Sequence, residues 1–327
     1  MRKWWQLLKA KGVVFTAPEQ VKVLDIEIPE PDLNEVGIRV LYSGISIGTE
    51  RWILTSKYKG TSYPLVSGYQ LCGIVEEVGS NVANLSKGDI VFTRYSRILG
   101  NVRSMWAGHV SYAVNDSTHV LKVPEGVSPI EASLAVMPAV PWHGIQLTKI
   151  YKGDLVIVIG MGLIGQMAAQ LARILGAKVI ALETLEKRRK LAELYSADIA
   201  LSPLKDDIES YVRKEKEEGA DVVIDTSANA GAVNSSFNWI RVNGRYCLQG
   251  YYPELTCIDL FLPHAKQITF FNPTDCEGID KVLEFIAQGK LKLKPLITHQ
   301  FNVEDAPKAY DLLLRHPEEA LGMVLRW

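Results

Sequence analysis

The chain lacks the features that would place it in a membrane or on a nucleic acid. None of its 327 residues belongs to an apolar run of the ~20 residues that a bilayer-spanning helix needs. The formal net charge is -1, so a basic surface for a polyanionic partner is not expected. Hydrophobic residues make up 47% and charged residues 22%, as in ordinary globular proteins. We therefore predict a globular protein that acts on a small molecule, with neither nucleic acid nor membrane as partner.

Cysteine is also scarce. The four cysteines have no Cys-x-x-Cys spacing and lie in apolar or mixed surroundings; they are Cys72, Cys247, Cys257 and Cys276. This pattern is typical of reduced packing thiols and does not indicate disulfide bonds or a metal knot. Reduced thiols in turn favour a cytoplasmic location.

Two kinds of pattern divide the chain. Between residues 12 and 123, short β-type runs alternate with turns, which predicts a mostly β barrel or sandwich. From residue 155 onwards, apolar β-type runs alternate with helical segments, which is typical of a doubly wound parallel sheet. The fold class is therefore α/β with a second, mostly β domain.

The boundary between these patterns is followed by a glycine motif. The run Leu155–Ile159 leads into Gly160-Met-Gly-Leu-Ile-Gly165, which opens a helical segment. In a dinucleotide-binding turn, Gly160 makes the tight turn, Gly162 lets the backbone approach the pyrophosphate, and Gly165 allows close packing of helix on strand. The amides of Leu163 and Ile164 would then face the anion at the helix N-terminus. Since strand, turn and helix occur in the required order, we predict a nucleotide site.

Glu183 stands at the end of the next predicted strand, about 20 residues after the glycines, where an acidic residue accepts hydrogen bonds from the adenosine ribose. Its charge would repel a 2'-phosphate, so NAD(H) is favoured over NADP(H). Arg188 and Arg189 follow closely and keep NADP(H) open as the less favoured cofactor. They either contact adenine or a phosphate, or they form a solvated helix face.

Two later strands of the same pattern end in polar or small residues. Ligands of doubly wound sheets bind at the carboxyl ends of the strands. Thr226, Ser227 and Gly250 are therefore candidates to flank the ribose and nicotinamide. Asp225 is equally compatible with a role as a helix cap.

Several further motifs, taken in order with the glycine turn, resemble the medium-chain dehydrogenase/reductase superfamily over the entire chain. The segments that carry the resemblance are 44–50 (Gly-Ile-Ser-Ile-Gly-Thr-Glu), 63–70, 76–82, 87–91 and 324–327. The resemblance implies a GroES-like domain over residues 1–136, a Rossmann domain over 137–273 and a segment 274–327 that completes the first domain. It also implies a catalytic cleft where the domains meet, and a homodimer.

Zinc-dependent members of that superfamily carry ligands that this chain has replaced. Where they have a catalytic Cys, a His-Glu pair and a third Cys or acidic ligand, this chain has Ser46 or Ile47, Tyr69 with Gln70, and Met137. None is a convincing zinc ligand. The four-cysteine lobe of such enzymes is missing as well, since no cysteine lies between residues 89 and 112. We expect an enzyme without zinc.

Among zinc-lacking members, segments 43–51 and 63–69 are similar to the bacteriochlorophyllide a dehydrogenase branch, whose members oxidise a hydroxyethyl group to an acetyl group. Ser67 and Gln70 depart from the pattern of that branch. Other secondary alcohols or sugar-like polyols are therefore equally open as substrates.

Without zinc, side chains must handle the hydroxyl proton of the substrate. Tyr69 takes the place of a lost ligand, and Thr49 matches the hydroxyl residue that begins the proton relay of the family. We hypothesise that Tyr69 or Thr49 hydrogen-bonds the substrate oxygen while Glu50 orients or receives the proton. In the alternative, Tyr69 only fills the empty metal pocket. His143 is a further candidate relay, although a packed, hydrogen-bonded histidine is the simpler interpretation.

Three functions remain open from the sequence. The leading hypothesis is a zinc-independent NAD(H)-dependent oxidoreductase for secondary alcohols or ketones. A quinone or enone reductase is the second, because an activated alkene accepts hydride without a metal. The third is a sensor that binds the nucleotide without turnover.

Overall fold

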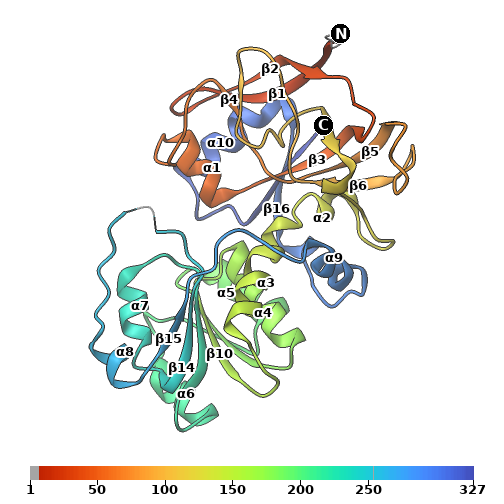
Figure 1. Ribbon diagram of the computed structural model, residues 1–327. Helices are drawn as coiled ribbons and strands as arrows, with labels where there is room; N and C mark the ends of the chain where they lie inside the picture. The colour runs from red at the N-terminus through yellow and green to blue at the C-terminus, as the bar shows by residue number, and fades with distance from the viewer. Residues whose placement is uncertain (1–6, 253) are drawn as a thin grey trace. The chain divides into compact units, whose positions relative to one another are not determined.

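The computed structural model describes residues 7–252 and 254–327, and it consists of two compact units. The first unit contains the chain up to Val136 together with Ile297–Trp327, and the second contains Met137–Leu296. In Figure 1 the blue elements β16 (Ile297–Asn302) and α10 (Ala306–Arg315) lie among the red and orange elements of the first unit. Residues from both ends of the sequence therefore build this unit.

Two sheets form the first unit. One has the order β2-β1-β4-β7, and the other has the order β16-β17-β3-β5-β6-β9, with β8 paired to β3. The strands are β1 (Leu7–Ala17), β2 (Gln20–Pro29), β3 (Glu35–Ile45), β4 (Leu65–Val66), β5 (Leu71–Val78), β6 (Ile90–Thr93), β7 (Arg103–Ser104), β8 (Tyr112–Asp116), β9 (Val120–Lys122) and β17 (Gly322–Arg326). The helices are α1 (Ile47–Leu54), α2 (Pro129–Ala132) and α10, with short turns η1 (Ser117–His119) and η4 (Val303–Asp305).

Alternate side chains of β1 pack into two different hydrophobic clusters. Val14 packs in a cluster with residues of β2, β3 and β5, whereas its neighbours Val13 and Phe15 pack in a second cluster with α1, α10 and β17. Successive side chains of a strand point to opposite faces, so a strand with apolar residues at consecutive positions can be covered on both sides. The second cluster holds α1 and α10 together next to the candidate catalytic residues.

The second unit is a doubly wound sheet. Its six strands have the order β12-β11-β10-β13-β14-β15 and all neighbours are parallel. This is the order of dinucleotide-binding sheets, with the first strand of the motif in the middle. The strands are β10 (Leu155–Ile159), β11 (Lys178–Leu182), β12 (Ile199–Leu201), β13 (Ala220–Asp225), β14 (Ile240–Leu248) and β15 (Thr269–Phe271).

Helices cover both faces of this sheet, with α3 and α4 on one side and α7 and α8 on the other in Figure 1. The helices are α3 (Val136–Thr148), α4 (Leu163–Ile174), α5 (Glu186–Leu191), α6 (Ile208–Glu215), α7 (Ala230–Ser236), α8 (Phe261–Ala265) and α9 (Ile279–Ala287), with η2 (Ala192–Ser196) and η3 (Lys294–Leu296). None of the helices in the described part of the chain has the length and apolarity required to cross a bilayer.

One domain boundary differs from the prediction. The sequence placed the end of the nucleotide-binding domain at residue 273, but residues 274–296 group with that unit in the structure. The reason is the packing of α9, where the Phe285 ring contacts Trp142 of α3 at 5.4 Å between centroids. The backbone of Lys292 adds two hydrogen bonds with the Gln170 amide. Residues 1–6 of the predicted first domain lie outside the described residues.

Candidate functional site

The glycine turn between β10 and α4 has three glycines in three different environments. Gly160 has a φ of 84°, which favours glycine. A Cβ on Gly165 would overlap the carbonyl oxygen of Gly160, so helix and turn pack too closely for a side chain there. Apart from adjacent residues of the same turn and helix, no described residue lies within 4 Å of a Cβ built on Gly162, whose φ is an ordinary -63°. The turn therefore leaves room for a ligand at Gly162, beside the first helical residues Leu163 and Ile164.

Glu183 holds this turn in place. One carboxylate oxygen accepts a hydrogen bond from the Met161 amide at 2.7 Å, and the other accepts one from the Leu185 amide at 2.9 Å. The side chain is buried among these donors. A carboxylate has about four acceptor positions, so capacity for a ribose hydroxyl remains.

The two arginines after Glu183 differ in their roles. The Arg189 guanidinium donates to the carbonyl oxygens of Glu183 at 2.9 Å and Thr184 at 3.3 Å, and thus caps the end of β11. Arg188 is half-buried, and its carbonyl oxygen accepts a hydrogen bond from Gln166 at 3.0 Å. Arg189 is therefore committed to the backbone, whereas Arg188 stays a candidate for cofactor contact.

The loops after β13 and β14 are organised by the buried carboxylate of Asp225. It accepts hydrogen bonds from the Ser227 amide at 3.1 Å, the Ser227 hydroxyl at 2.6 Å and the Tyr252 hydroxyl. The Thr226 hydroxyl donates to the carbonyl oxygen of Gly160 at 2.7 Å, which ties this loop to the glycine turn. The Gly250 amide donates to the Asp225 carbonyl oxygen at 2.9 Å. Of the three predicted residues, Ser227 thus bonds the Asp225 carboxylate, Gly250 bonds the Asp225 backbone, and Thr226 bonds the glycine turn.

In the first unit, three hydroxyl groups meet. The Tyr69 hydroxyl hydrogen-bonds the Ser46 hydroxyl and lies 3.4 Å from the Thr49 hydroxyl. Ser46 directly precedes α1 without a side-chain capping bond, Thr49 lies in the first turn of α1, and Tyr69 precedes β5. The family resemblance assigns metal ligands to the positions of Ser46 or Ile47 and of Tyr69. We call Ser46, Thr49 and Tyr69 the hydroxyl cluster.

Glu50 lies behind this cluster and is fully buried. One carboxylate oxygen accepts a hydrogen bond from the Ser46 amide at 2.8 Å. The other lies 2.9 Å from His109 Nε2 and accepts a hydrogen bond from the Tyr310 hydroxyl. Burial, and then the negative charge of Glu50, hold the pKa of Tyr310 well above its usual range, so this phenol remains a donor. Glu50 therefore orients the backbone of the hydroxyl cluster.

His109 extends the network. Its Nδ1 lies 2.8 Å from the Ser43 hydroxyl, which also accepts a hydrogen bond from the Trp327 indole at 2.9 Å. Local sequence patterns assign no role to Tyr310, or to Ser43 and Trp327, which lie in segments that carry the family resemblance. No local pattern could have found them, because the contact between Tyr310 and Glu50 spans 260 residues.

His143 is not part of this network. It lies in α3 of the second unit, where its Nδ1 is 3.5 Å from a carboxylate oxygen of Glu277. The structure thus brings Tyr69, Thr49 and Glu50 together in one unit and places the fourth predicted catalytic residue in the other.

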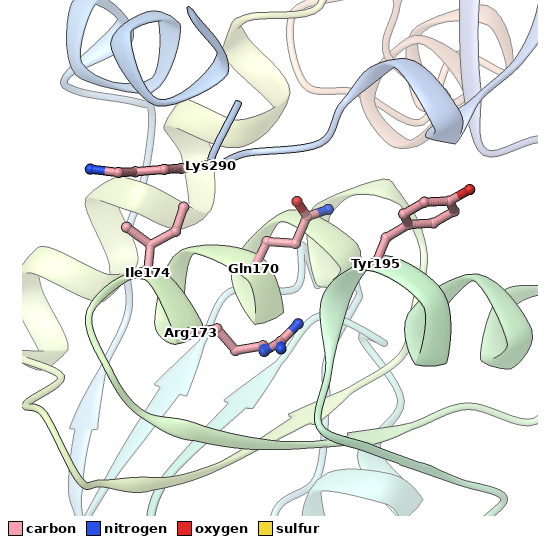
Figure 2. Close-up of a pocket in the computed structure, with 5 residues that line it drawn as sticks. All are labelled: Gln170, Arg173, Ile174, Tyr195 and Lys290. Atoms are coloured by element: carbon pink, nitrogen blue, oxygen red, sulfur yellow. The ribbon is translucent and has the colours of Figure 1, made fainter. Parts of the chain in front are cut away.

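A hollow of about 350 Å³ lies on the second unit, between α4, the η2 turn and the segment after α9. Figure 2 shows its lining residues Gln170, Arg173, Ile174, Tyr195 and Lys290. Within the described part of the chain, these residues include none of the predicted cofactor-binding positions. This hollow is therefore separate from the glycine turn.

Comparisons with known proteins agree with both units. A family model described as "Alcohol dehydrogenase GroES-like domain" matches residues 32–125, and one described as "Zinc-binding dehydrogenase" matches residues 164–288. The chain belongs to the medium-chain dehydrogenase/reductase superfamily. This medium-chain enzyme is accordingly an oxidoreductase, and the predicted superfamily and fold class are confirmed.

Relatives of this medium-chain dehydrogenase/reductase match nearly end to end. An L-threonine 3-dehydrogenase of Caldanaerobacter subterraneus is 29% identical, with 91% of this chain and 93% of the relative covered. A 2-desacetyl-2-hydroxyethyl bacteriochlorophyllide A dehydrogenase of Cereibacter sphaeroides is 25% identical, with 98% and 99% covered. An Escherichia coli oxidoreductase of unknown specificity has the same fold, with a TM-score of 0.88, 23% identity, and 98% and 99% covered.

Proposed function

We propose that this protein is an NAD(H)-dependent oxidoreductase that interconverts secondary alcohols and ketones without a catalytic zinc ion. The observation that carries the proposal is the hydroxyl cluster of Ser46, Thr49 and Tyr69, at positions that the family uses for metal ligation and proton transfer. Superfamily membership supplies the reaction class, and the named relatives are dehydrogenases.

The donor set at these positions does not fit zinc. Proteins bind zinc through thiolate, imidazole or carboxylate groups, whereas Ser46 and Tyr69 offer hydroxyls, Gln70 an amide and Met137 a thioether. The nearest carboxylate, Glu50, already binds the Ser46 amide, His109 and Tyr310. In the described residues, the one grouping of three metal-type ligands is the exposed His316, Glu318 and Glu319.

The second unit does fit a dinucleotide. The open space at Gly162 and the N-terminus of α4 suit a pyrophosphate, and Glu183 suits the ribose hydroxyls. The negative charge of Glu183 favours NAD(H) over the phosphorylated cofactor. Leu163, Ile164, Arg188, Thr226, Ser227 and Gly250 would complete the binding site.

Bound nicotinamide would supply or accept the hydride, which leaves the proton to the side chains. During ketone reduction, the Tyr69 hydroxyl donates a hydrogen bond to the carbonyl oxygen and then gives its proton to the developing alkoxide. The Ser46 and Thr49 hydroxyls stabilise the phenolate left behind by turning their protons towards it. Tyr69 is only partly buried, so water can return the proton. Glu50 acts as a positioning residue through the Ser46 amide.

Removal of the Tyr69 hydroxyl tests this mechanism. In Tyr69→Phe, we expect kcat/KM for a secondary alcohol to fall by about a hundredfold or more, because the proton donor is lost while the ring remains. Thr49→Val should show a smaller loss, since it removes one stabilising hydroxyl. Both are measured from NADH absorbance over a panel of alcohols, ketones, quinones and enones.

Tyr112→Phe is a matched control, because the Tyr112 hydroxyl bonds Glu77 at the surface and has no part in the cluster. Unchanged kcat/KM in both Tyr69→Phe and Thr49→Val would remove the hydroxyl cluster from catalysis. Selective NADPH-driven reduction of a quinone by the wild type would favour a quinone reductase instead. Tight NADH binding with no turnover on the panel would favour a sensor.

A further inference from the structure

Two aromatic rings extend from Tyr69 of the hydroxyl cluster. The Trp106 ring packs edge-on against Tyr69, with 5.3 Å between centroids, and against Tyr58, with 6.0 Å. All three side chains are partly exposed. We call Tyr58, Tyr69 and Trp106 the aromatic wall. Tyr69, whose hydroxyl is the proton donor of the proposed mechanism, thus also contributes its ring to an apolar surface.

An unusual backbone conformation holds Trp106 in this wall. Trp106 and Ala107 have φ values of 70° and 55°, in the left-handed region that residues other than glycine rarely adopt. Flanking hydrogen bonds fix the segment, from the Met105 amide to the Val66 carbonyl at 2.9 Å and from the Gly108 amide to the Gly68 carbonyl at 2.7 Å. A large side chain at a strained position points to a functional constraint on where its ring lies.

The carboxylate of Glu50 does not reach this surface. Glu50 is fully buried and accepts hydrogen bonds from Ser46 and Tyr310 on the inner side. A substrate oxygen bound by the hydroxyl cluster would have the aromatic wall beside it. Such a surface can satisfy one substrate oxygen, but a polyol would leave further hydroxyl groups against the rings without partners.

We propose that the aromatic wall selects secondary alcohols and ketones that carry an aromatic or alicyclic ring next to the reacting carbon, in preference to polyols. Trp106 is the specificity-determining residue, because its indole provides the flat face and its ring fixes the Tyr69 ring. This inference rests on the proposed function and adds the substrate class to it.

The test compares three substrates in the wild type and three variants. Wild type should oxidise 1-phenylethanol with a higher kcat/KM than 2-propanol, and sorbitol should be the poorest substrate. Trp106→Leu keeps an apolar side chain but removes the ring, so the preference for 1-phenylethanol over 2-propanol should fall about tenfold or more. Trp106→Phe, which keeps a ring, should retain most of the preference. Tyr211→Ala, at an exposed aromatic residue of α6, is the control and should leave both rates unchanged.

A binding measurement separates this inference from the proposed function. Acetophenone and dihydroxyacetone are titrated by calorimetry into the NADH-saturated protein, which reports affinity without turnover. Tighter acetophenone binding that weakens in Trp106→Leu supports the aromatic wall even if no alcohol is oxidised, and then only the proposed function fails. Equal binding of the two ketones, higher kcat/KM for sorbitol, or equal losses for both alcohols in Trp106→Leu would each overturn the inference.

Discussion

The Glu50 side chain is fully buried, so its carboxylate has no contact with water. Burial of an unpaired carboxylate is strongly unfavourable, and several donors offset that cost here. A consistent hydrogen-bond assignment has neutral His109 donating through Nε2 to Glu50, while Ser43 donates to Nδ1 and accepts from Trp327. At the scale of single residues, the position of the hydroxyl cluster therefore depends on groups that never contact substrate.

Tyr310→Phe tests this dependence. Loss of the phenol removes one donor to a buried charge, so we expect the free energy of unfolding to fall by about 1–3 kcal/mol, measured by urea denaturation. Tyr246→Phe is the control, since the Tyr246 hydroxyl bonds the neutral Ser236 at 2.8 Å, and its loss should be smaller.

The difference between wild type and Tyr310→Phe also has a predicted pH dependence. Because the pKa of Tyr310 is raised in the folded protein, its stabilisation is present below the unfolded pKa of about 10 and is lost as the pH rises through the folded value. The difference should therefore be the same at pH 7 and pH 9 and should shrink above about pH 10. A difference that grows in alkali would contradict the assignment of Tyr310 as a neutral donor.

At the scale of elements, two glycines in the turn between β10 and α4 have different roles. One is required for packing within the fold, and the other leaves space for a ligand. Gly165 is needed because its helix contacts the Gly160 carbonyl, whereas Gly162 has an ordinary backbone conformation and open space around it. Local sequence patterns predicted this turn well, since the conformational roles of the glycines depend on neighbours within a few residues.

The two glycines give opposite predictions when each is replaced by alanine. Gly162→Ala should melt close to wild type but bind NADH about tenfold or more weakly, because the methyl group fills the space that the pyrophosphate approaches. Gly165→Ala should lose about 3 kcal/mol of stability through overlap with the turn. Thermal melting and fluorescence titration with NADH and NADPH measure both effects. Unchanged NADH affinity in Gly162→Ala would show that the turn is only structural.

At the scale of the whole molecule, the first unit is built from both ends of the chain. Strand β17 pairs with β3, and Trp327 and Tyr310 reach the network around Glu50. The second unit has its own sheet and core, and residues 274–296 belong to it through α9. The chain thus folds as an interrupted unit with a continuous unit inserted in it.

Removal of metal ions tests whether the activity of the whole protein depends on zinc. We expect protein purified without added zinc and then dialysed against EDTA to keep its full activity with NAD, because the positions of the lost ligands carry hydroxyl, amide and thioether groups. Metal content is measured by plasma mass spectrometry beside the activity. One tightly bound zinc per chain whose removal abolishes activity would contradict the proposal.

The sequence by itself determined the features that depend on local geometry. Apolar periodicity and the spacing of Gly160, Gly162 and Gly165 act on backbone conformation over short distances, so they predicted the doubly wound sheet and its glycine turn. Only the tertiary structure decided what surrounds Tyr69 and Glu50, and where residues 274–296 belong. Those contacts join side chains far apart in the chain, and their formation depends on the packing of whole units, which no local pattern records.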